Sequence, residues 1–443
     1  MCGCARNGRP ELLSEGADAQ RSPVARRLEG ATVIDGSGAT PQLGWTVIIG
    51  ESGTISYAGP DASAPPRDDR PVEDLSGLTL LPGLIDAHVH LSFEPGQALM
   101  AGQRDPVLNT FGVAERMRRT LLSGITTVRD LGGVPKGFAT AQETDVIAGP
   151  RMLTAGKILG HTGGHCDCTM QNGINAAAHF TALADDETAL RVAVRTQFRD
   201  GADLVKICAT GGMGSPHDDP DDEDLSEHEI RAVVDEARRH RGKKVAAHAQ
   251  GTAGILNAIR GGVASIEHGY GITDEACDLA LESGVFLVPT LSTLFHTSPT
   301  ASQKQRDKKA RWAERTRINI ARAIERGVAV AMGTDAGVSP HGANAQELQW
   351  LVDLGMKPLD AITAATSNGA RLLGVDGVTG TIRAGLQADM LVLSSDPAAD
   401  VSVLGEPENI RVIIQSGIIR KDLRAARPGN AIGGAGSGGS SRS

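Results

Sequence analysis

The sequence predicts an α/β protein: a (β/α)8 barrel of the TIM type, with a small discontinuous β-sandwich domain built from both chain ends. Two observations predict the barrel. Along the middle of the chain, short apolar and β-branched runs alternate with helix-like segments, and polar or glycine-rich turns follow the runs. A third observation predicts the second domain, because the two stretches that flank this rhythm contain short strand-like runs separated by Gly and Asp turns.

The expected barrel comprises residues 81–382. Its candidate strands are residues 83–90, 125–130, 152–157, 203–210, 244–248, 265–268, 285–290 and 328–334. Helical segments lie between them: Ser226 and Glu229 have the spacing of a capping box, and apolar residues then recur at helical spacing. Residues 302–325 are a second expected helix, rich in Lys and Arg. Strands that alternate with helices in this way are typical of a parallel α/β barrel.

The expected β domain combines residues 28–80 with residues 383–425. Its candidate strands are residues 31–34, 46–49, 54–58, 389–393, 410–415 and 417–421. Pairing these two stretches makes the domain discontinuous in sequence. Residues 1–27 and the Gly/Ser-rich residues 426–443 are predicted to be flexible.

The composition disfavours several classes of function. The chain has 443 residues, a net charge of −9 and only 3% aromatic residues, which argues against a nucleic-acid partner. Its first 27 residues carry charges without an apolar core, and no run of about 18 apolar residues occurs. Neither a signal peptide nor a membrane partner is therefore expected. Six scattered cysteines suit a reducing compartment, so we expect a cytoplasmic protein.

The strongest local signal is the run Asp86-Ala87-His88-Val89-His90. Residues two apart on a strand face the same side, so His88 and His90 are both expected to point toward the barrel axis. Two imidazoles held this close are costly to bury unless their lone pairs are used, and a divalent cation uses them. The alternative is a pair of hydrogen-bonded core histidines. The pairing of the two residues favours the metal.

Lys206 lies in the apolar run of residues 203–207. Burial penalises the charge of a lysine and favours its neutral amine. A neutral amine can react with carbon dioxide to give a carbamate, which is an anionic ligand able to bridge two metal ions. The alternative is an ion pair with a carboxylate such as Asp203, and this segment alone favours that alternative.

Three further residues of metal-ligand type end candidate strands: His248, His268 and Asp335. The C-terminal ends of barrel strands converge on one rim, where active sites form. Together with His88 and His90, these side chains would place five nitrogen- or oxygen-bearing groups on that rim. Such a set indicates a metal site rather than core packing.

The runs LPGLIDAHVHL, VKI followed by ATGG, VAAHA, SIEHG and GTDAG resemble the amidohydrolase superfamily over about residues 28–425. The likeness is closest to the branch that holds Xaa-Pro dipeptidases, related carboxypeptidase-like enzymes and ochratoxin-type amidases. This resemblance implies two divalent metal ions. Zinc suits such ligands, and cobalt, manganese or iron can occupy them as well. The implied ligands are His88, His90 and Asp335 for one ion, His248 and His268 for the other, and N-carboxylated Lys206 as the bridge.

The resemblance also implies a mechanism. Two cations share a water and lower its pKa, so that hydroxide is available near neutral pH. Asp335 is expected to be catalytic as well as a ligand, because it would accept the proton of that water and deliver it to the leaving group. His165 matches the TGGH run of the same branch and is the second expected catalytic residue, which would hydrogen-bond the substrate carbonyl and stabilise the oxyanion.

Loops after the strands hold the expected substrate-binding residues, which are His161, His165, Tyr270 and His341. For His161 a supporting role behind the site is an equal alternative. For Tyr270 the equal alternative is packing against its neighbours. His341 belongs to another expected rim loop.

Two features of these loops stay open. Cys166 and Cys168 have a spacing that suits a metal, but two thiols without further cysteine partners are weak support. Residues 216–224 hold six acidic residues in nine positions. Most such runs are solvated surface, and the alternative is an acidic lid that disfavours anionic substrates.

The leading functional hypothesis is hydrolysis of an amide or peptide bond in a small N-acyl amino acid or dipeptide. The substrate would be Xaa-Pro-like, carboxypeptidase-like or ochratoxin-type, with a free carboxylate on the leaving amino acid. A first alternative is a urea, carbamate, lactone or other ester, or phosphotriester hydrolysed by the same site. A second is a non-catalytic scaffold, against which the complete ligand set argues. The resemblance also implies a homo-oligomer with a small molecule as its substrate.

Overall fold

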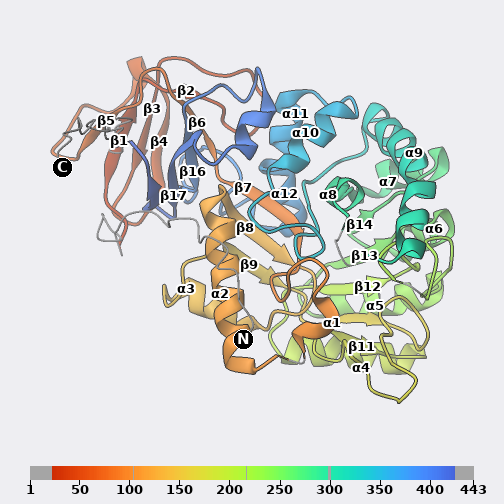
Figure 1. Cartoon of the computed structure of the whole chain (residues 1–443). Coiled ribbons are helices and arrows are strands. Elements are labelled where there is room, and N and C mark those ends of the chain that lie inside the picture. Colours follow the sequence, from red (N-terminus) through yellow and green to blue (C-terminus); the bar gives the residue numbers. More distant parts are fainter. Residues whose placement is uncertain (1–21, 103, 216, 298–300, 425–443) are drawn as a thin grey trace, which may run out of the picture.

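The structure is a computed structural model that describes residues 22–102, 104–215, 217–297 and 301–424. Of the ends predicted to be flexible, residues 1–21 and 426–443 lie outside these described residues. The described chain forms parallel sheets with helices on their outer side, and two further sheets stand beside them (Figure 1). This is the α/β architecture that the sequence predicts.

Two parallel sheets carry the middle of the chain, in the orders β7-β8-β9 and β11-β10-β12-β13-β14-β15. Their strands are β7 (Leu84–Val89), β8 (Ile125–Asp130), β9 (Arg151–Thr154), β10 (Ile158–Gly160), β11 (Thr181–Leu183), β12 (Val205–Cys208), β13 (Val245–Ala249), β14 (Ser265–His268) and β15 (Phe286–Val288). Every predicted barrel strand before residue 291 overlaps one of them. These runs form strands because their apolar, β-branched side chains are buried on both faces of a parallel sheet.

The last predicted strand, residues 328–334, is not a regular strand. The segment is extended but forms only isolated parallel bridges. These pair Val330 with Leu287 of β15, and Ala336 with Val89 of β7. The segment therefore lies between the last and the first of the parallel strands. The backbone leaves the extended conformation at Asp335, which follows this segment and takes a positive φ of 54°.

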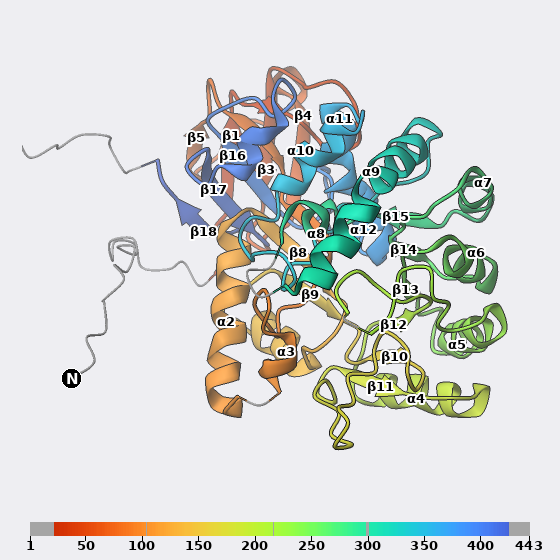
Figure 2. The same ribbon diagram turned by 45° about the vertical axis from the view of Figure 1, so that its right-hand side comes forward.

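Helices cover the outer side of the parallel strands, and Figure 2 shows α4 to α7 in a row beside β10 to β15. The α-helices are α1 (Ala98–Ala101), α2 (Pro106–Leu122), α3 (Lys136–Glu143), α4 (Glu187–Arg199), α5 (Glu227–Arg239), α6 (Thr252–Gly261), α7 (Asp274–Ser283), α8 (Leu291–Phe295), α9 (Gln303–Glu325), α10 (Gln346–Asp353), α11 (Pro358–Ala364) and α12 (Ser367–Leu373). Capping boxes begin α5 at Ser226 and α9 at Ser302, which confirms both predicted helix starts.

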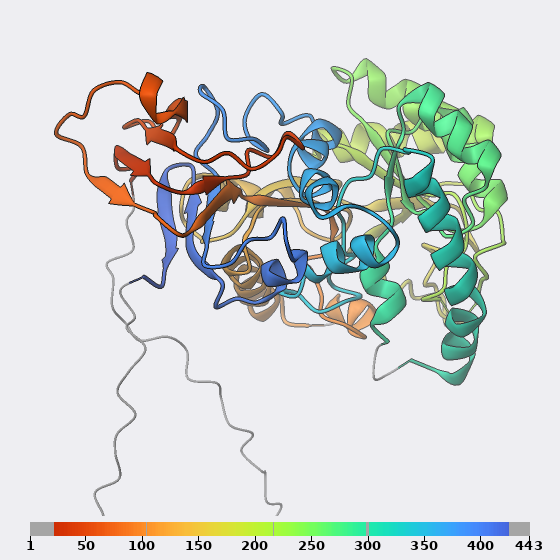
Figure 3. The ribbon, with the colours of Figure 1, turned by 90° about the horizontal axis from the view of Figure 1, so that it is seen from above.

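Both ends of the described chain contribute strands to the two sheets beside the parallel strands (Figures 1 and 3). The orders are β4-β3-β1-β5 and β18-β17-β16-β6-β2. The strands are β1 (Arg26–Glu29), β2 (Thr32–Val33), β3 (Trp45–Ile49), β4 (Ile55–Pro60), β5 (Val72–Asp74), β6 (Thr79–Pro82), β16 (Met390–Leu393), β17 (Ile410–Gln415) and β18 (Ile418–Asp422), with 3-10 turns η1 (Asp61–Ser63) and η2 (Val401–Gly405).

The N-terminal and the C-terminal parts of the described chain share one apolar core. Val47 and Leu80 from the N-terminal part pack in one apolar cluster with Met390 and Val412 from the C-terminal part. Strand β16 also pairs with β6 in antiparallel register. β1 begins at Arg26, two residues before the expected start of this region.

A larger apolar cluster lies between the parallel strands and the outer helices. Val205 and Ile207 of β12 belong to it together with Val233 of α5 and Ile255 of α6. The cluster positions the C-terminal ends of the strands, where the polar side chains described next are found. Within the described residues, no helix combines the length and the apolar composition needed to cross a membrane.

Candidate active site

Three of the predicted metal ligands lie close enough to share one cation. His88 lies on β7 and His90 directly follows that strand, two residues on, while Asp335 follows the extended segment beside it. One ligand atom of each residue lies within 4.8 Å of the other two. Oδ1 of Asp335 is 3.3 Å from Nε2 of His90 and 3.5 Å from Nε2 of His88. All three side chains are buried.

Asp86 fixes the two elements that carry this group. Its Oδ2 accepts hydrogen bonds from Oγ1 of Thr334 (2.6 Å) and Nδ2 of Asn344 (2.7 Å), and its Oδ1 accepts one from the N–H of His88 (3.0 Å). One carboxylate thus ties β7 to the segment that ends in Asp335. Nothing local in the sequence indicates the contact between Asn344 and Asp86.

His248 and His268 end the neighbouring strands β13 and β14, as predicted. Their ring centroids are 4.6 Å apart, and the ring of His268 is 5.2 Å from that of His88. Nδ1 of His268 lies 2.6 Å from Oγ1 of Thr290, and Nε2 of His248 lies 3.1 Å from the carbonyl oxygen of Gly211. The four predicted histidine ligands therefore form one cluster.

The backbone is strained around this cluster. His268, Thr290 and Asp335 have positive φ values of 73°, 47° and 54°, a region that residues other than glycine rarely adopt. Such strain is typical of functional sites whose surroundings over-determine the geometry. Glu347 holds the chain after Thr290, because its carboxylate accepts hydrogen bonds from the N–H groups of the next two residues at 2.7 Å each.

Lys206 of β12 is buried, and its Nζ has no hydrogen-bond partner among the described residues. Burial lowers the pKa of its ammonium group, which favours the neutral amine. The ion pair with Asp203 that the sequence left open is not formed, because Asp203 pairs with Lys136 at 3.2 Å.

This donor set fits divalent cations. Nζ of Lys206 and Oδ1 of Asp335 are buried without hydrogen-bond partners among the described residues, which is costly unless something else binds them. Burial is the main cause of the lowered pKa of all four histidines, so their rings are neutral and offer lone pairs. Neutral imidazoles with a carboxylate are the ligands that zinc and similar ions prefer.

A buried ion pair supports His88 from behind. Glu267 precedes His268 on β14, and its Oε2 lies 2.9 Å from Nδ1 of His88. Its Oε1 accepts a hydrogen bond from Nη2 of Arg129 at 2.7 Å. Sequence reasoning missed both residues. The available signal was a charged residue within a predicted strand, at Arg129 in β8 and at Glu267 in β14.

The loop after β10 brings His165 to the cluster. Its ring stacks on that of His248 with centroids 4.2 Å apart and an interplanar angle of 18°. His161 lies farther out and half-exposed, with Nε2 at 2.9 Å from Oδ1 of Asp224. The supporting alternative for His161 thus matches its position better than substrate contact does, whereas His165 stands next to a predicted ligand.

The acidic run of residues 216–224 is solvated in part, as expected. Asp221, Asp222 and Glu223 are exposed, whereas Asp218, Asp219 and Asp224 are half-buried. Three of these carboxylates pair with the basic face of α9: Asp218 with Lys308 (3.8 Å), Asp219 with Arg311, and Asp221 with Arg315 (3.9 Å). Asp218 and Asp224 also contact the loop after β10, at His165.

Tyr270 and His341 are both buried. Oη of Tyr270 lies 2.5 Å from Oγ1 of Thr293 and 3.2 Å from Oγ1 of Thr290. Its ring centroid is 5.5 Å from that of His268, so the residue borders the cluster. Nε2 of His341 donates to the carbonyl oxygen of Phe93 (2.9 Å), and burial lowers the pKa of His341 to about 4.

The cysteines do not group as their spacing suggested. Sγ of Cys166 lies 2.6 Å from Sγ of Cys208 on β12 rather than beside Cys168. The His/Cys/Asp/Glu group close enough to hold a metal ion contains His88, His90 and Asp335 and no cysteine, within the part of the chain that the structure describes. A metal site at Cys166 and Cys168 is therefore not supported.

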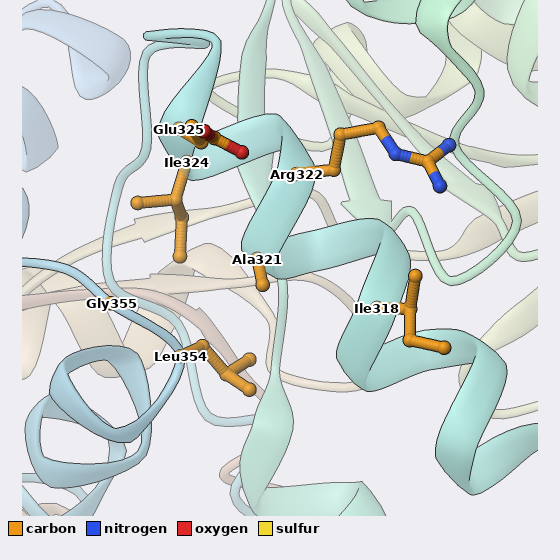
Figure 4. Close-up of a pocket in the computed structure, with 7 residues that line it drawn as sticks. All are labelled: Ile318, Ala321, Arg322, Ile324, Glu325, Leu354 and Gly355. Carbon is orange, nitrogen blue, oxygen red and sulfur yellow. The ribbon is translucent and has the colours of Figure 1, made fainter.

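A cavity of about 550 Å³ lies on the outer side of the molecule, between the C-terminal half of α9 and residues 354–355 (Figure 4). Its lining includes Ile318, Ile324 and Leu354, with Arg322 and Glu325 on the helix. None of the predicted site residues lines it, so we place the candidate active site at the histidine cluster.

The chain is similar to known proteins over most of its length. The model of the amidohydrolase family matches residues 79–419. Ochratoxinase of Aspergillus niger is 30% identical over 393 residues, which cover 83% of this chain and 81% of that protein.

Two solved structures share the fold over most of the chain. A Xaa-Pro dipeptidase with bound methionine in its active site is 31% identical with a TM-score of 0.80, covering 89% of this chain and 99% of that one. A prolidase complexed with N-methylphosphonate-L-proline is 29% identical with a TM-score of 0.82, covering 90% and 100%. The α/β fold is therefore TIM-barrel-like, and the protein is a hydrolase that acts on C–N bonds. The chain belongs to the amidohydrolase family.

Proposed function

We propose that the protein is a binuclear metal-dependent hydrolase that cleaves an amide or peptide bond in small N-acyl amino acids or dipeptides. The observation that carries this proposal is the buried cluster of four neutral histidines, Asp335 and an unpaired Lys206. The relatives support the substrate class, since they include an ochratoxinase and a Xaa-Pro dipeptidase with bound methionine. The proposed substrate carries a free carboxylate on its leaving amino acid.

We also propose that the parallel strands close into a barrel and that the two further sheets form a separate small domain. The bridges of residues 328–336 to β15 and to β7 support a (β/α)8 barrel in which this segment takes the place of the eighth strand. The core shared by the two chain ends supports a discontinuous β-sandwich domain.

The metal ligands follow from the cluster. His88, His90 and Asp335 would hold one ion, and His248 and His268 would hold the other. Lys206 would bridge them as a carbamate: its neutral amine adds to carbon dioxide, one N–C bond forms, and one proton is released to solvent. Zinc suits this set best, with cobalt, manganese or iron as other occupants. When bound, the ions supply the Lewis acidity that lowers the pKa of a water and polarises a carbonyl.

The chain's own residues complete the reaction. Asp335 accepts a proton from the attacking water on its carboxylate and delivers that proton to the leaving nitrogen. His165 hydrogen-bonds the substrate carbonyl oxygen and stabilises its developing charge. Tyr270 packs with Met213, Leu294 and Trp312 beside the cluster, and this apolar wall excludes water from the reacting groups.

A substrate panel tests the proposal. Metal-replete protein is assayed with dipeptides and N-acyl amino acids, alongside matched compounds whose α-carboxylate is blocked as an amide. Esters, ureas and phosphotriesters complete the panel. We expect turnover of the free carboxylates and a marked loss with the blocked ones. Turnover confined to esters, ureas or phosphotriesters would contradict the substrate assignment. A protein that binds no divalent metal on reconstitution and turns over no substrate of the panel would contradict the catalytic assignment.

We also propose a cytoplasmic homo-oligomer that takes a small-molecule substrate and has no nucleic-acid or membrane partner. The net charge of −9 and the scarcity of aromatic residues support the exclusion of nucleic acid. Sedimentation of the purified protein tests the oligomeric state.

A further inference from the structure

A carboxylate from the acidic run contacts the ring of His165. Oδ2 of Asp218 lies 2.7 Å from Nδ1 of His165, across 53 residues of sequence. We propose that Asp218 is a positioning residue, which holds the His165 imidazole in the orientation that presents Nε2 to the substrate carbonyl. This inference rests on the proposed function, because it assigns His165 to the same reaction.

The ring of His165 is confined on several sides. It stacks on His248, and the N–H of His165 donates to Oδ2 of Asp224 at 2.8 Å. Gly212 leaves room for it, since a Cβ at that position would lie 2.9 Å from Nε2 of His165. The stack fixes the plane of the ring, but a flip of half a turn about χ2 would keep that plane. The hydrogen bond from Nδ1 to Asp218 distinguishes the two flips.

Asp218 is itself held in place. Its Oδ1 accepts from the N–H of Gly212 at 3.2 Å. The nearly buried ammonium group of Lys308 donates to the carbonyl oxygens of Gly212 (3.0 Å), Ser215 (2.8 Å) and Asp218. Burial alone would raise the pKa of Asp218, but the hydrogen bond from His165 and the nearby cations outweigh it, and the pKa lies below its usual value. The acceptor is therefore a fixed carboxylate.

The charge of Asp218 serves the proposed chemistry. An imidazole that donates through both nitrogens is positively charged, and a carboxylate at Nδ1 offsets that charge. Nε2 can then donate to an oxygen on which negative charge develops. The arrangement resembles other sites in which a buried carboxylate fixes the orientation of a catalytic histidine.

A double-mutant cycle between Asp218 and His165 tests the inference. Asp218→Asn should lower kcat by about a hundredfold with little change in KM, because the misplaced ring fails mainly in the transition state. In the His165→Ala background, Asp218→Asn should leave kcat almost unchanged. Asp218→Glu should restore part of the loss. Metal content and melting temperature are measured for every variant, and both should stay near wild type.

Asp219→Asn is the matched control. Asp219 belongs to the same acidic run and pairs with Arg311 of α9, so its loss probes the loop without touching His165. We expect near-wild-type kinetics. An unchanged kcat/KM in His165→Ala would overturn the proposed role of His165 itself. A loss in His165→Ala together with an additive cycle would instead overturn the role of Asp218 alone.

A second, independent observation concerns two buried thiols. Cys166 follows His165 on its loop, Cys208 ends β12, and their sulfur atoms are 2.6 Å apart without being bonded. We propose that this pair forms a disulfide that links the His165 loop to the strand of Lys206. Gly160 of β10 makes room for it, because a Cβ there would lie 3.1 Å from Cβ of Cys166.

The step is an ordinary thiol–disulfide exchange. A low-molecular-weight disulfide such as oxidised glutathione accepts two electrons and becomes two thiols, while the S–S bond forms between Cys166 and Cys208. A sulfur–sulfur bond is about 2.0 Å long, so the side chains need to move little. Burial raises the pKa of Cys166, so the exchange is slow at neutral pH.

Peptide mapping tests the disulfide. Protein incubated with oxidised glutathione is unfolded, alkylated and digested without reductant, and linked peptides are identified by mass. We expect a Cys166–Cys208 link with Cys168 and Cys277 alkylated, and a higher melting temperature that Cys166→Ser abolishes. Alkylation of both partners, or a Cys166–Cys168 link, would overturn the proposal.

Discussion

Nδ1 of His88 lies 2.9 Å from Oε2 of Glu267, a residue 179 positions later in the chain. Strand β14 therefore contributes two side chains to the site: His268 at its end, and Glu267 one residue earlier, which contacts His88. A hydrogen bond at Nδ1 fixes the ring of a histidine and leaves Nε2 to face a metal ion. Arg129 completes the arrangement, because its guanidinium balances the buried carboxylate.

Glu267→Gln should weaken metal binding about tenfold to a hundredfold, because the ring of His88 loses its charged partner. It should also lower the free energy of unfolding by about 3 kcal/mol or more, since Arg129 is left as an uncompensated buried charge. Titration of the metal-free protein with zinc and urea denaturation measure the two effects. Glu282→Gln, an exposed change on α7, is the control. Wild-type zinc affinity in Glu267→Gln would contradict this role.

Lys206→Ala should abolish turnover, because the bridging carbamate cannot form. The fold should persist, since removal of a buried amine without a hydrogen-bond partner leaves no polar group unpaired. Reconstitution of the metal-free wild type should also depend on bicarbonate in the buffer. Activity, metal content and circular dichroism are compared with Lys357→Ala, an exposed lysine before α11. Retained activity in Lys206→Ala would remove the carbamate bridge.

Asp86→Asn should lower the free energy of unfolding by about 1–3 kcal/mol. The carboxylate of Asp86 accepts hydrogen bonds from Thr334, Asn344 and the backbone N–H of His88. In the Asn variant an NH2 group replaces one carboxylate oxygen, so it would face one of these donors and could not accept its hydrogen bond. Urea denaturation measures the effect. Asp376→Asn is a matched change outside this network. Equal midpoints for Asp86→Asn and the wild type would show that the carboxylate does not hold the two elements together.

Glu236→Gln should lower the free energy of unfolding by about 1 kcal/mol at neutral pH. The effect is small because solvent screens the exposed partner of Glu236, Arg195. Hydrogen bonds from Arg195 on α4 are the main cause that lowers the pKa of Glu236 to about 2. Because the pKa of Glu236 is lower in the folded protein than in the unfolded chain, its ionised carboxylate stabilises the fold at pH values above the unfolded pKa of 4.5. This stabilisation is lost as the pH falls toward the folded pKa of about 2. The difference between variant and wild type, measured by urea denaturation at pH 7, 4 and 3, should therefore shrink only at the two lower values.

The sequence by itself determined where the candidate ligands lie and which local elements form. The two-residue period of a strand places His88 and His90 on one face, and the order of strand-end motifs places His248, His268 and Asp335 beside them. Capping boxes at Ser226 and Ser302 set helix starts through neighbouring residues alone. These features depend on backbone periodicity and short-range hydrogen bonds, which a sequence pattern encodes directly.

Only the tertiary structure decided which polar groups meet. Glu267 contacts His88 across 179 residues of sequence, and Asp218 contacts His165 across 53. Cys166 lies next to Cys208, which is 42 residues later in the chain. The irregular backbone at Asp335 likewise depends on the strand packed beside it. Such contacts are set by how close the folded strands and loops bring side chains together, and the spacing of residues along the chain contains no measure of that distance.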